Sequence, residues 1–125
     1  MNIKDMKVGE VLEIAKMLGG KGDEATLNRM IGQRVIVRTY SAGVWFGTLD
    51  EKSGNEVILT DARRMWRWWA AKGISLSGCA NHGVLHEKSK IVEPVESVWL
   101  EAIEIIPCTM AACLNIEAAL NAKAE

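Results

Sequence analysis

The chain has 125 residues, of which 49% are hydrophobic and 25% charged, and its formal net charge is −1. This length fits one domain, and the composition excludes a disordered tail or a fibrous chain. Charges interrupt every apolar run before it reaches the ~18 residues of a membrane span, and the first residues lack a signal-peptide pattern. We therefore expect a cytoplasmic protein without a membrane partner.

The first 31 residues are predicted to form a helical arm. Apolar residues recur at helical spacing over residues 7–18, and Gly19-Gly20 gives a natural stop before a flexible joint. A second short helical turn is expected around Leu27, Met30 and Ile31. Such an arm can cover a sheet edge, dock on a neighbouring subunit or cap its own core.

Residues 32–107 are predicted to form a small antiparallel β domain, so that the fold is mainly β (α+β). Its sheet can close in a barrel-like form. Alternating patterns indicate strands at 33–40, 44–49 and 56–60, joined by short turns in a meander. Gly47 within the second strand indicates a bulge or a sharp bend. Further short strands are expected at 91–94, 98–100 and 102–106, with Pro94 at an edge.

Two short helices complete the predicted fold. The first covers about residues 75–82, with Ser75 or Ser77 as its cap and Gly83 at its end. The second covers about residues 109–122, within a segment 108–125 that packs on the β domain. Its apolar residues at near-helical spacing are Met110, Cys113, Leu114 and Leu120.

No pattern typical of catalysis rises above background. The sequence contains no GxSxG elbow, no GxxxxGK[ST] phosphate loop and no HExxH zinc motif. Cys79, Cys108 and Cys113 lack CxxC spacing, so we interpret them as small buried hydrophobes rather than as zinc ligands or disulfides. His82 and His86 fall in a polar loop. We therefore expect a binding protein, not an enzyme, with no cofactor and no metal.

One segment differs from the rest: residues 63–69, RRMWRWW, hold three of the five tryptophans and half of the six arginines. Tryptophan rings stack on nucleobases, and arginine forks bind phosphates and stack on aromatic rings. The same residue types dominate protein–protein hot spots. Three interpretations stay open: core packing, a subunit or partner interface, and a nucleotide or nucleic-acid site.

This segment is predicted to be extended rather than helical, because it continues a strand and is rich in tryptophan. As a strand it places Arg64, Trp66 and Trp68 on one face. The other face then holds Arg63, Met65, Arg67 and Trp69. The candidate ligand-binding residues are Arg38, Tyr40, Arg63, Arg64, Trp66, Arg67, Trp68 and Trp69.

The charge is unevenly distributed along the chain. Residues 29–72 hold eight basic and four acidic side chains, a balance of +4, whereas residues 87–125 hold three basic and seven acidic, a balance of −4. A basic middle suits an anionic ligand on one face, and the two regions together equally suit head-to-tail self-association. The weak overall charge disfavours non-specific duplex binding.

The run GQRVIVRTYSAGVWFGTL at 32–49 resembles a family of small, mostly uncharacterised proteins of tailed bacteriophages and prophages. The segments DARRMW at 61–66, SLS at 75–77 and EAIEIIP at 101–107 add to the resemblance, which covers about residues 30–109. Its most specific part is VIVRTYSAGVWFGTL. The resemblance implies a viral protein that acts in the host bacterial cytosol, and it carries over no catalytic residues.

Residues 33–62 also resemble the first half of Sm-like domains. The resemblance lies in a strand, a turn, Gly47-Thr48-Leu49, an acidic turn, and a pattern that begins at Asn55 and alternates Val57 with Leu59. Sm-like domains form small barrels that assemble into rings and bind RNA, so this resemblance implies a single-stranded RNA or DNA binder.

The leading hypothesis is a phage-encoded, non-enzymatic homo-oligomer that sequesters a nucleotide-type anionic ligand, such as a signalling nucleotide of bacterial immunity. It would thereby counter host defence. The first alternative is Sm-like binding of single-stranded RNA or DNA. The second is a protein–protein inhibitor or adaptor of a host protein.

Overall fold

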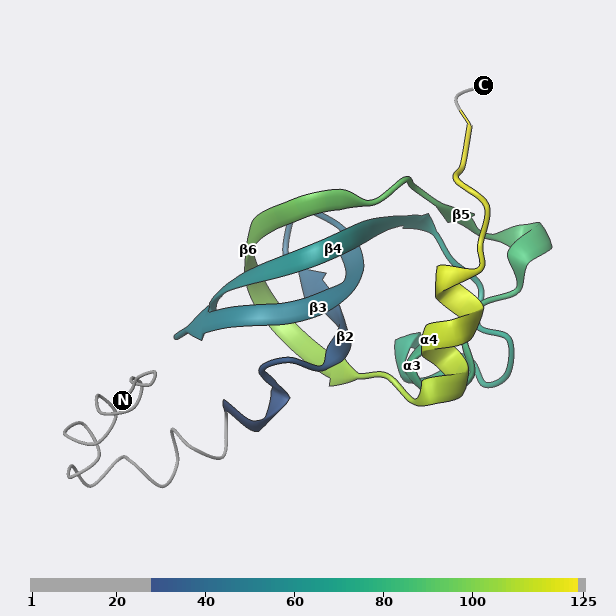
Figure 1. Cartoon of the computed structure of the whole chain (residues 1–125). Helices are drawn as coiled ribbons and strands as arrows, with labels where there is room; N and C mark the ends of the chain where they lie inside the picture. The colour runs from purple at the N-terminus through teal and green to yellow at the C-terminus, as the bar shows by residue number, and fades with distance from the viewer. Residues whose placement is uncertain (1–27, 124–125) are drawn as a thin grey trace, which may run out of the picture.

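The computed structural model describes residues 28–123, and in this part of the chain four long strands form a closed circuit (Figure 1). They are β2 (Arg34–Thr39), β3 (Val44–Ser53), β4 (Glu56–Arg67) and β6 (Val95–Pro107). Their order is β3-β2-β6-β4, all pairs are antiparallel, and β3 also pairs with β4. A short strand, β5 (Lys90–Ile91), extends the sheet beside β4. The predicted mainly β, antiparallel fold is confirmed.

The predicted helical arm lies almost entirely outside the described residues. Its described end contains a 3₁₀ turn, η1 (Asn28–Met30), at the position where a second short helical turn is expected. The carbonyl of Met30 accepts a hydrogen bond from the Gln33 amide at 3.0 Å, which leads the chain into β2. Met30 also packs against the apolar residues enclosed by the strands.

Two apolar clusters lie on the two faces of the strands. The inner cluster contains Val35, Val37, Trp45, Leu49, Val57, Leu59, Ala62, Leu100 and Ala102. The outer cluster contains Ile36, Phe46, Met65, Leu76, Cys79, Ala80, Val84, Ile91 and Ile116. Strand β2 contributes alternate residues to both, so its two faces are buried. Burial on both faces explains why Val35, Ile36 and Val37 follow one another without a polar residue between them.

Strand β3 bends at Gly47, which confirms the predicted irregularity. Its register with β4 shifts between Phe46 and Thr48. A Cβ atom at Gly47 would lie 3.1 Å from both the Ala62 Cα atom and the Thr60 carbonyl oxygen. Because both neighbours are backbone atoms, a larger residue here would push the two strands apart by a few tenths of an ångström.

The prediction of separate short strands between residues 98 and 106 is wrong. Residues 95–107 form the single strand β6, which pairs with β4 along its first half and with β2 along its second. Pairing on both sides holds this strand together even though glutamates, which are poor strand formers, interrupt it. Pro94 lies in the linker between β5 and β6, outside both strands.

Two helices cover the outer cluster, namely α3 (Leu76–His82) and α4 (Met110–Glu117) (Figure 1). Helix α3 has the predicted extent and ends at Gly83, whose φ of 91° favours glycine. Ser75 occupies the predicted N-cap position, but its hydroxyl bonds that of Ser77 at 2.7 Å and makes no cap bond. Within the described residues no helix is long and apolar enough to cross a membrane.

Helix α4 is shorter than predicted and turns a different face to the core. The Thr109 hydroxyl caps it by accepting a hydrogen bond from the Ala112 amide at 3.1 Å. Ala112 and Ile116 are buried, whereas Met110 and Leu114 are exposed. Of the predicted apolar face, Cys113 packs partly against the outer cluster, whereas Met110 and Leu114 point to solvent, so this part of the prediction is wrong.

Candidate functional site

The Arg/Trp segment of residues 63–69 begins as part of strand β4, which confirms the extended interpretation up to Arg67. Asp61 interrupts the regular alternation just before it, with a φ of 50°. After this irregularity Arg63 and Met65 are buried, whereas Trp66 and Arg67 are exposed. The segment is therefore divided into a buried part and an exposed part.

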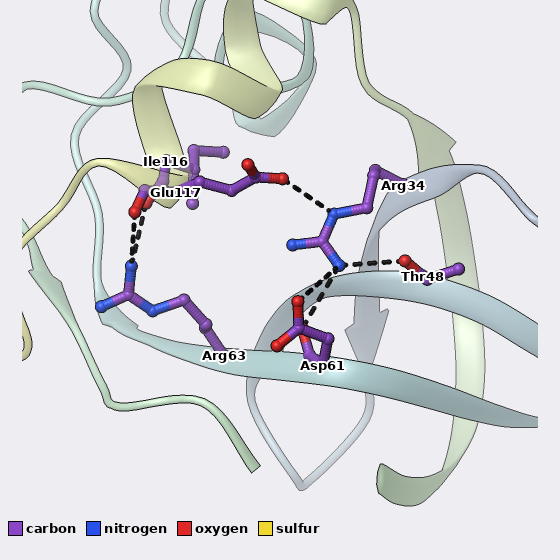
Figure 2. Close-up of polar contacts among 6 residues, drawn as sticks. All are labelled: Arg34, Thr48, Asp61, Arg63, Ile116 and Glu117. Carbon is purple, nitrogen blue, oxygen red and sulfur yellow. Dashed lines mark hydrogen bonds and ion pairs between the residues drawn. The ribbon is translucent and has the colours of Figure 1, made fainter. Parts of the chain in front are cut away.

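Arg63 is 5% exposed and lies under the C-terminal end of α4 (Figure 2). Its guanidinium donates to the carbonyl of Ile116 at 3.0 Å and to that of Val92 at 2.9 Å. It also donates to the Asn121 side-chain oxygen at 2.9 Å. Carbonyls at a helix C-terminus lack partners within the helix and attract cations, so an arginine is well suited to this position.

Burial also lowers the pKa of the Arg63 guanidinium, an effect that the charge of Asp61 partly opposes. Arginine stays protonated in proteins even so, because its ordinary pKa lies far above neutrality. The charge is compensated by the carbonyl oxygens around it. Arg63 is thus fully occupied in joining α4 to the strands, and no ligand is needed to explain it.

Arg34, which the sequence did not single out, makes a second connection between α4 and the strands (Figure 2). Its Nε atom lies 3.1 Å from the Glu117 carboxylate, and its Nη1 atom donates to the Thr48 hydroxyl at 3.0 Å. The guanidinium carbon also lies 4.4 Å from the centre of the Phe46 ring. A partly buried arginine in three such contacts stabilises the fold.

Arg64 closes one end of the inner cluster. Its guanidinium carbon lies 4.5 Å from the centre of the Trp45 ring, and its Nη1 atom donates to the Ala42 carbonyl at 3.2 Å. The Trp45 indole N–H donates to the same carbonyl at 3.1 Å. The stacking expected between arginine and tryptophan is therefore present, but within the protein itself.

Arg38 and Tyr40 lie apart from the other candidate residues. Arg38 is on the outer face of β2, where its Nε atom donates to the Glu104 carboxylate at 2.9 Å. Tyr40 is 91% exposed in the turn between β2 and β3. Neither residue lines the hollow formed by the tryptophans.

That hollow, which we call the tryptophan hollow, has a volume of about 310 Å³ and is lined by Trp68, Trp69, Ala70, Gly73 and Ile74. Trp68 packs partly against the outer cluster, whereas Trp69 is 55% exposed. The Lys88 ammonium lies 4.9 Å from the centre of the Trp69 ring. The structure thus combines an apolar hollow with a cation beside one of its rings.

Two lining residues of the hollow, and the lysine beside its Trp69 ring, were not predicted from the sequence. Gly73 and Ile74 belong to the loop before α3, and Lys88 to the 3₁₀ turn η2 (His86–Lys88). Ile74 is 99% exposed. A large apolar side chain in solvent indicates that this loop can take part in binding. From the sequence alone it is indistinguishable from a buried residue.

The cysteine and histidine residues form no potential metal site in the described part of the chain, which contains no group of three or more potential metal ligands. All three cysteines are free. Burial raises the pKa of the Cys79 thiol to about 11 and, with help from Cys113, that of Cys108 to about 12. These two thiols are protonated at neutral pH and are poor nucleophiles and metal ligands.

Comparison with known proteins gives a family without an assigned activity. No curated protein matches the chain. Residues 32–116 match a family described as a domain of unknown function, DUF6948, over nearly the same residues as the phage resemblance. The phage origin and the Sm-like resemblance stay predictions. The chain belongs to the DUF6948 family.

Proposed function

We propose that this protein is a non-enzymatic binding protein whose tryptophan hollow takes a planar anionic ligand of the nucleotide class. The observation that carries the proposal is the pairing of two tryptophans in one hollow with the Lys88 ammonium 4.9 Å from the Trp69 ring. Small-molecule sites usually measure ~300–1,000 Å³. At about 310 Å³ the hollow suits one base or one similar ring system.

Positive charge near the hollow supports an anionic ligand. Arg67 and Lys72 are exposed, and each lies next in the chain to residues that line the hollow. Together with Lys88 they can receive phosphate oxygens from a ligand whose ring stacks on tryptophan. Arg63 and Arg64 are not part of this proposal, because their guanidiniums are engaged within the protein.

Isothermal titration against a panel of cyclic and linear nucleotides tests the proposal. Trp69→Ala should weaken binding by ~1–3 kcal/mol, the usual contribution of one stacked base. Lys88→Ala should weaken it too and should reduce its salt dependence. Trp99→Ala is the matched control, because Trp99 is similarly exposed but lies on β6, away from the hollow. No heat with any nucleotide, from protein shown to be folded, would refute the proposal.

The wider hypothesis, that a phage encodes this protein to sequester an immune signalling nucleotide, is supported by the sequence resemblance alone. Its specific test is whether cyclic signalling nucleotides bind more tightly than linear mononucleotides. If oligonucleotides bind instead, with an affinity that falls steeply with salt, the Sm-like alternative gains support.

A role in binding a host protein is the second candidate, and the exposure of Trp66 favours it. Trp66 is 70% exposed and lies outside the tryptophan hollow. Exposed tryptophan and arginine often anchor interfaces. This candidate predicts a co-purifying host protein that is lost with Trp66→Ala or Arg67→Ala. If both variants retain the host protein in full, the candidate fails.

A further inference from the structure

The outer face of β3, β4 and β6 carries an exposed tryptophan and three glutamates. In the sheet register, Ile58 of β4 lies between Glu51 of β3 and Trp99 of β6. In the next row, Glu56 lies directly opposite Glu101. We call these five residues the Trp99 face. Trp99 is 56% exposed.

The charges of the Trp99 face are unbalanced within the described residues. Like charges directly opposite each other in a sheet are unfavourable, as Glu56 and Glu101 are here. Lys52, the neighbour of Glu51 in β3, donates a hydrogen bond from its ammonium to the Gly54 carbonyl at 2.7 Å. The described residues provide no ion pair for the three glutamates. A cationic surface docked on this face would relieve their repulsion.

The same chain carries a surface of the opposite kind near the tryptophan hollow. We call it the basic end, formed by Arg67, Trp69, Lys72, Ile74 and Lys88. Trp69 and Ile74 are 55% and 99% exposed. Each surface therefore has one exposed tryptophan, together with three glutamates on the Trp99 face and three basic side chains at the basic end.

We infer that the Trp99 face of one copy docks on the basic end of a second copy. A second copy is the occupant indicated by charge complementarity, because the complementary surface is present on this chain. Tryptophan with surrounding charges is typical of interface hot spots. Since the two docking surfaces differ, the contact is head-to-tail and leaves one of each surface free, so it builds a ring or a filament.

Docking of this kind also affects the tryptophan hollow. Trp69 belongs both to the hollow and to the basic end, so a docked copy competes with a ligand in the hollow. This consequence rests on the proposed function, whereas the association itself does not. Nucleotide is therefore omitted from the test of association.

Sedimentation of the full chain without nucleotide tests the inference. The wild type should associate with rising concentration, and the association should weaken as salt is raised. Glu101→Lys and Lys88→Glu should each raise the dissociation constant at least about tenfold, because each reverses one charge of the contact. Trp99→Ala should weaken association without changing the charge. Circular dichroism verifies that each variant is folded.

Mixing the two charge variants distinguishes head-to-tail docking from symmetrical pairing. An equimolar mixture of Glu101→Lys and Lys88→Glu should recover association, since each variant retains the surface that the other has lost. A wild type that stays monomeric at about 100 μM would overturn the inference. So would variants that associate like the wild type, or a mixture that fails to recover.

The same variants separate this inference from the proposed function. Glu101→Lys leaves the tryptophan hollow intact, so its nucleotide binding should match or exceed that of the wild type. Loss of association with retained nucleotide binding supports both proposals. The variants can instead change association as predicted while Glu101→Lys binds no nucleotide. That result supports the docking alone and refutes the ligand proposal.

Discussion

Arg63 and Arg67 are four residues apart in one strand, but the structure uses them in different ways. Arg63 is buried beneath α4 and donates to carbonyl oxygens of Ile116 and Val92. Arg67 is exposed at the end of β4, next to the tryptophan hollow. The difference teaches that an arginine in this strand can bind a ligand only where no helix covers it.

Helix α4 is the element that separates these two regions. It ends above Arg63, so its terminal carbonyls take the guanidinium as a partner (Figure 2). Beyond Met65 the strand is no longer covered by α4, and Trp66 is exposed. Stability is therefore expected to depend on the first region and binding on the second.

The largest effect among the arginines is expected for Arg63→Met, which should lower the free energy of unfolding by about 3–5 kcal/mol. The substitution keeps much of the side-chain volume but leaves buried carbonyls of Ile116 and Val92 without their donor. Urea denaturation measures the change. Arg67→Met is the matched control and should cost less than about 0.5 kcal/mol. Equal losses of unfolding free energy in the two variants would contradict the division of the segment into a buried and an exposed part.

A smaller loss, about 1–2 kcal/mol, is expected for Arg64→Ala. The variant loses the contact with the Trp45 ring and the hydrogen bond to the Ala42 carbonyl, both at a partly exposed site. The fluorescence of Trp45 should also change, since the cation next to its ring is removed. A loss as large as that of Arg63→Met would mean that the exposed side of the strand is as important for stability as the covered side.

The helix-covered region should also show a specific response to alkaline pH. Burial raises the pKa of Cys79 from 9.0 to about 11 and that of Cys108 to about 12, so the folded state holds these protons more tightly than the unfolded state. Stability from this source is complete below about pH 9 and is lost as pH rises towards 12. Denaturation at pH 8, 9.5 and 10.5 should show a steeper decline for wild type than for Cys108→Ala. Identical slopes would contradict this.

Most of the strand architecture could be predicted because local patterns agree with tertiary structure there. The alternation at residues 33–60, the turns and the bend at Gly47 all follow from short-range rules. The continuous strand β6 could not be predicted, because pairing with β2 and β4 holds it together. The same reason applies to α4, whose buried side depends on the surface that it meets.

The candidate site could be predicted only in part. Composition identified the segment that contains Trp68 and Trp69, but not which of its arginines the fold would use. That choice depends on α4, which is more than forty residues away in the chain. Lys88 and Ile74 were missed because neither belongs to a recognisable motif. Charge and aromatic content therefore predict which segment contains the site, whereas burial determines which of its side chains can bind a ligand.

The smallest effect on stability is expected for Trp66→Ala. Trp66 is 70% exposed, so truncation removes little buried surface and should change the free energy of unfolding by less than about 0.5 kcal/mol. Trp45→Ala is the matched comparison and should cost about 3–5 kcal/mol, because Trp45 is buried in the inner cluster. Urea denaturation monitored by circular dichroism avoids the loss of fluorescence in either variant. A cost for Trp66→Ala above about 1.5 kcal/mol would show that Trp66 belongs to the folded core, and its role as a free binding residue would then be wrong.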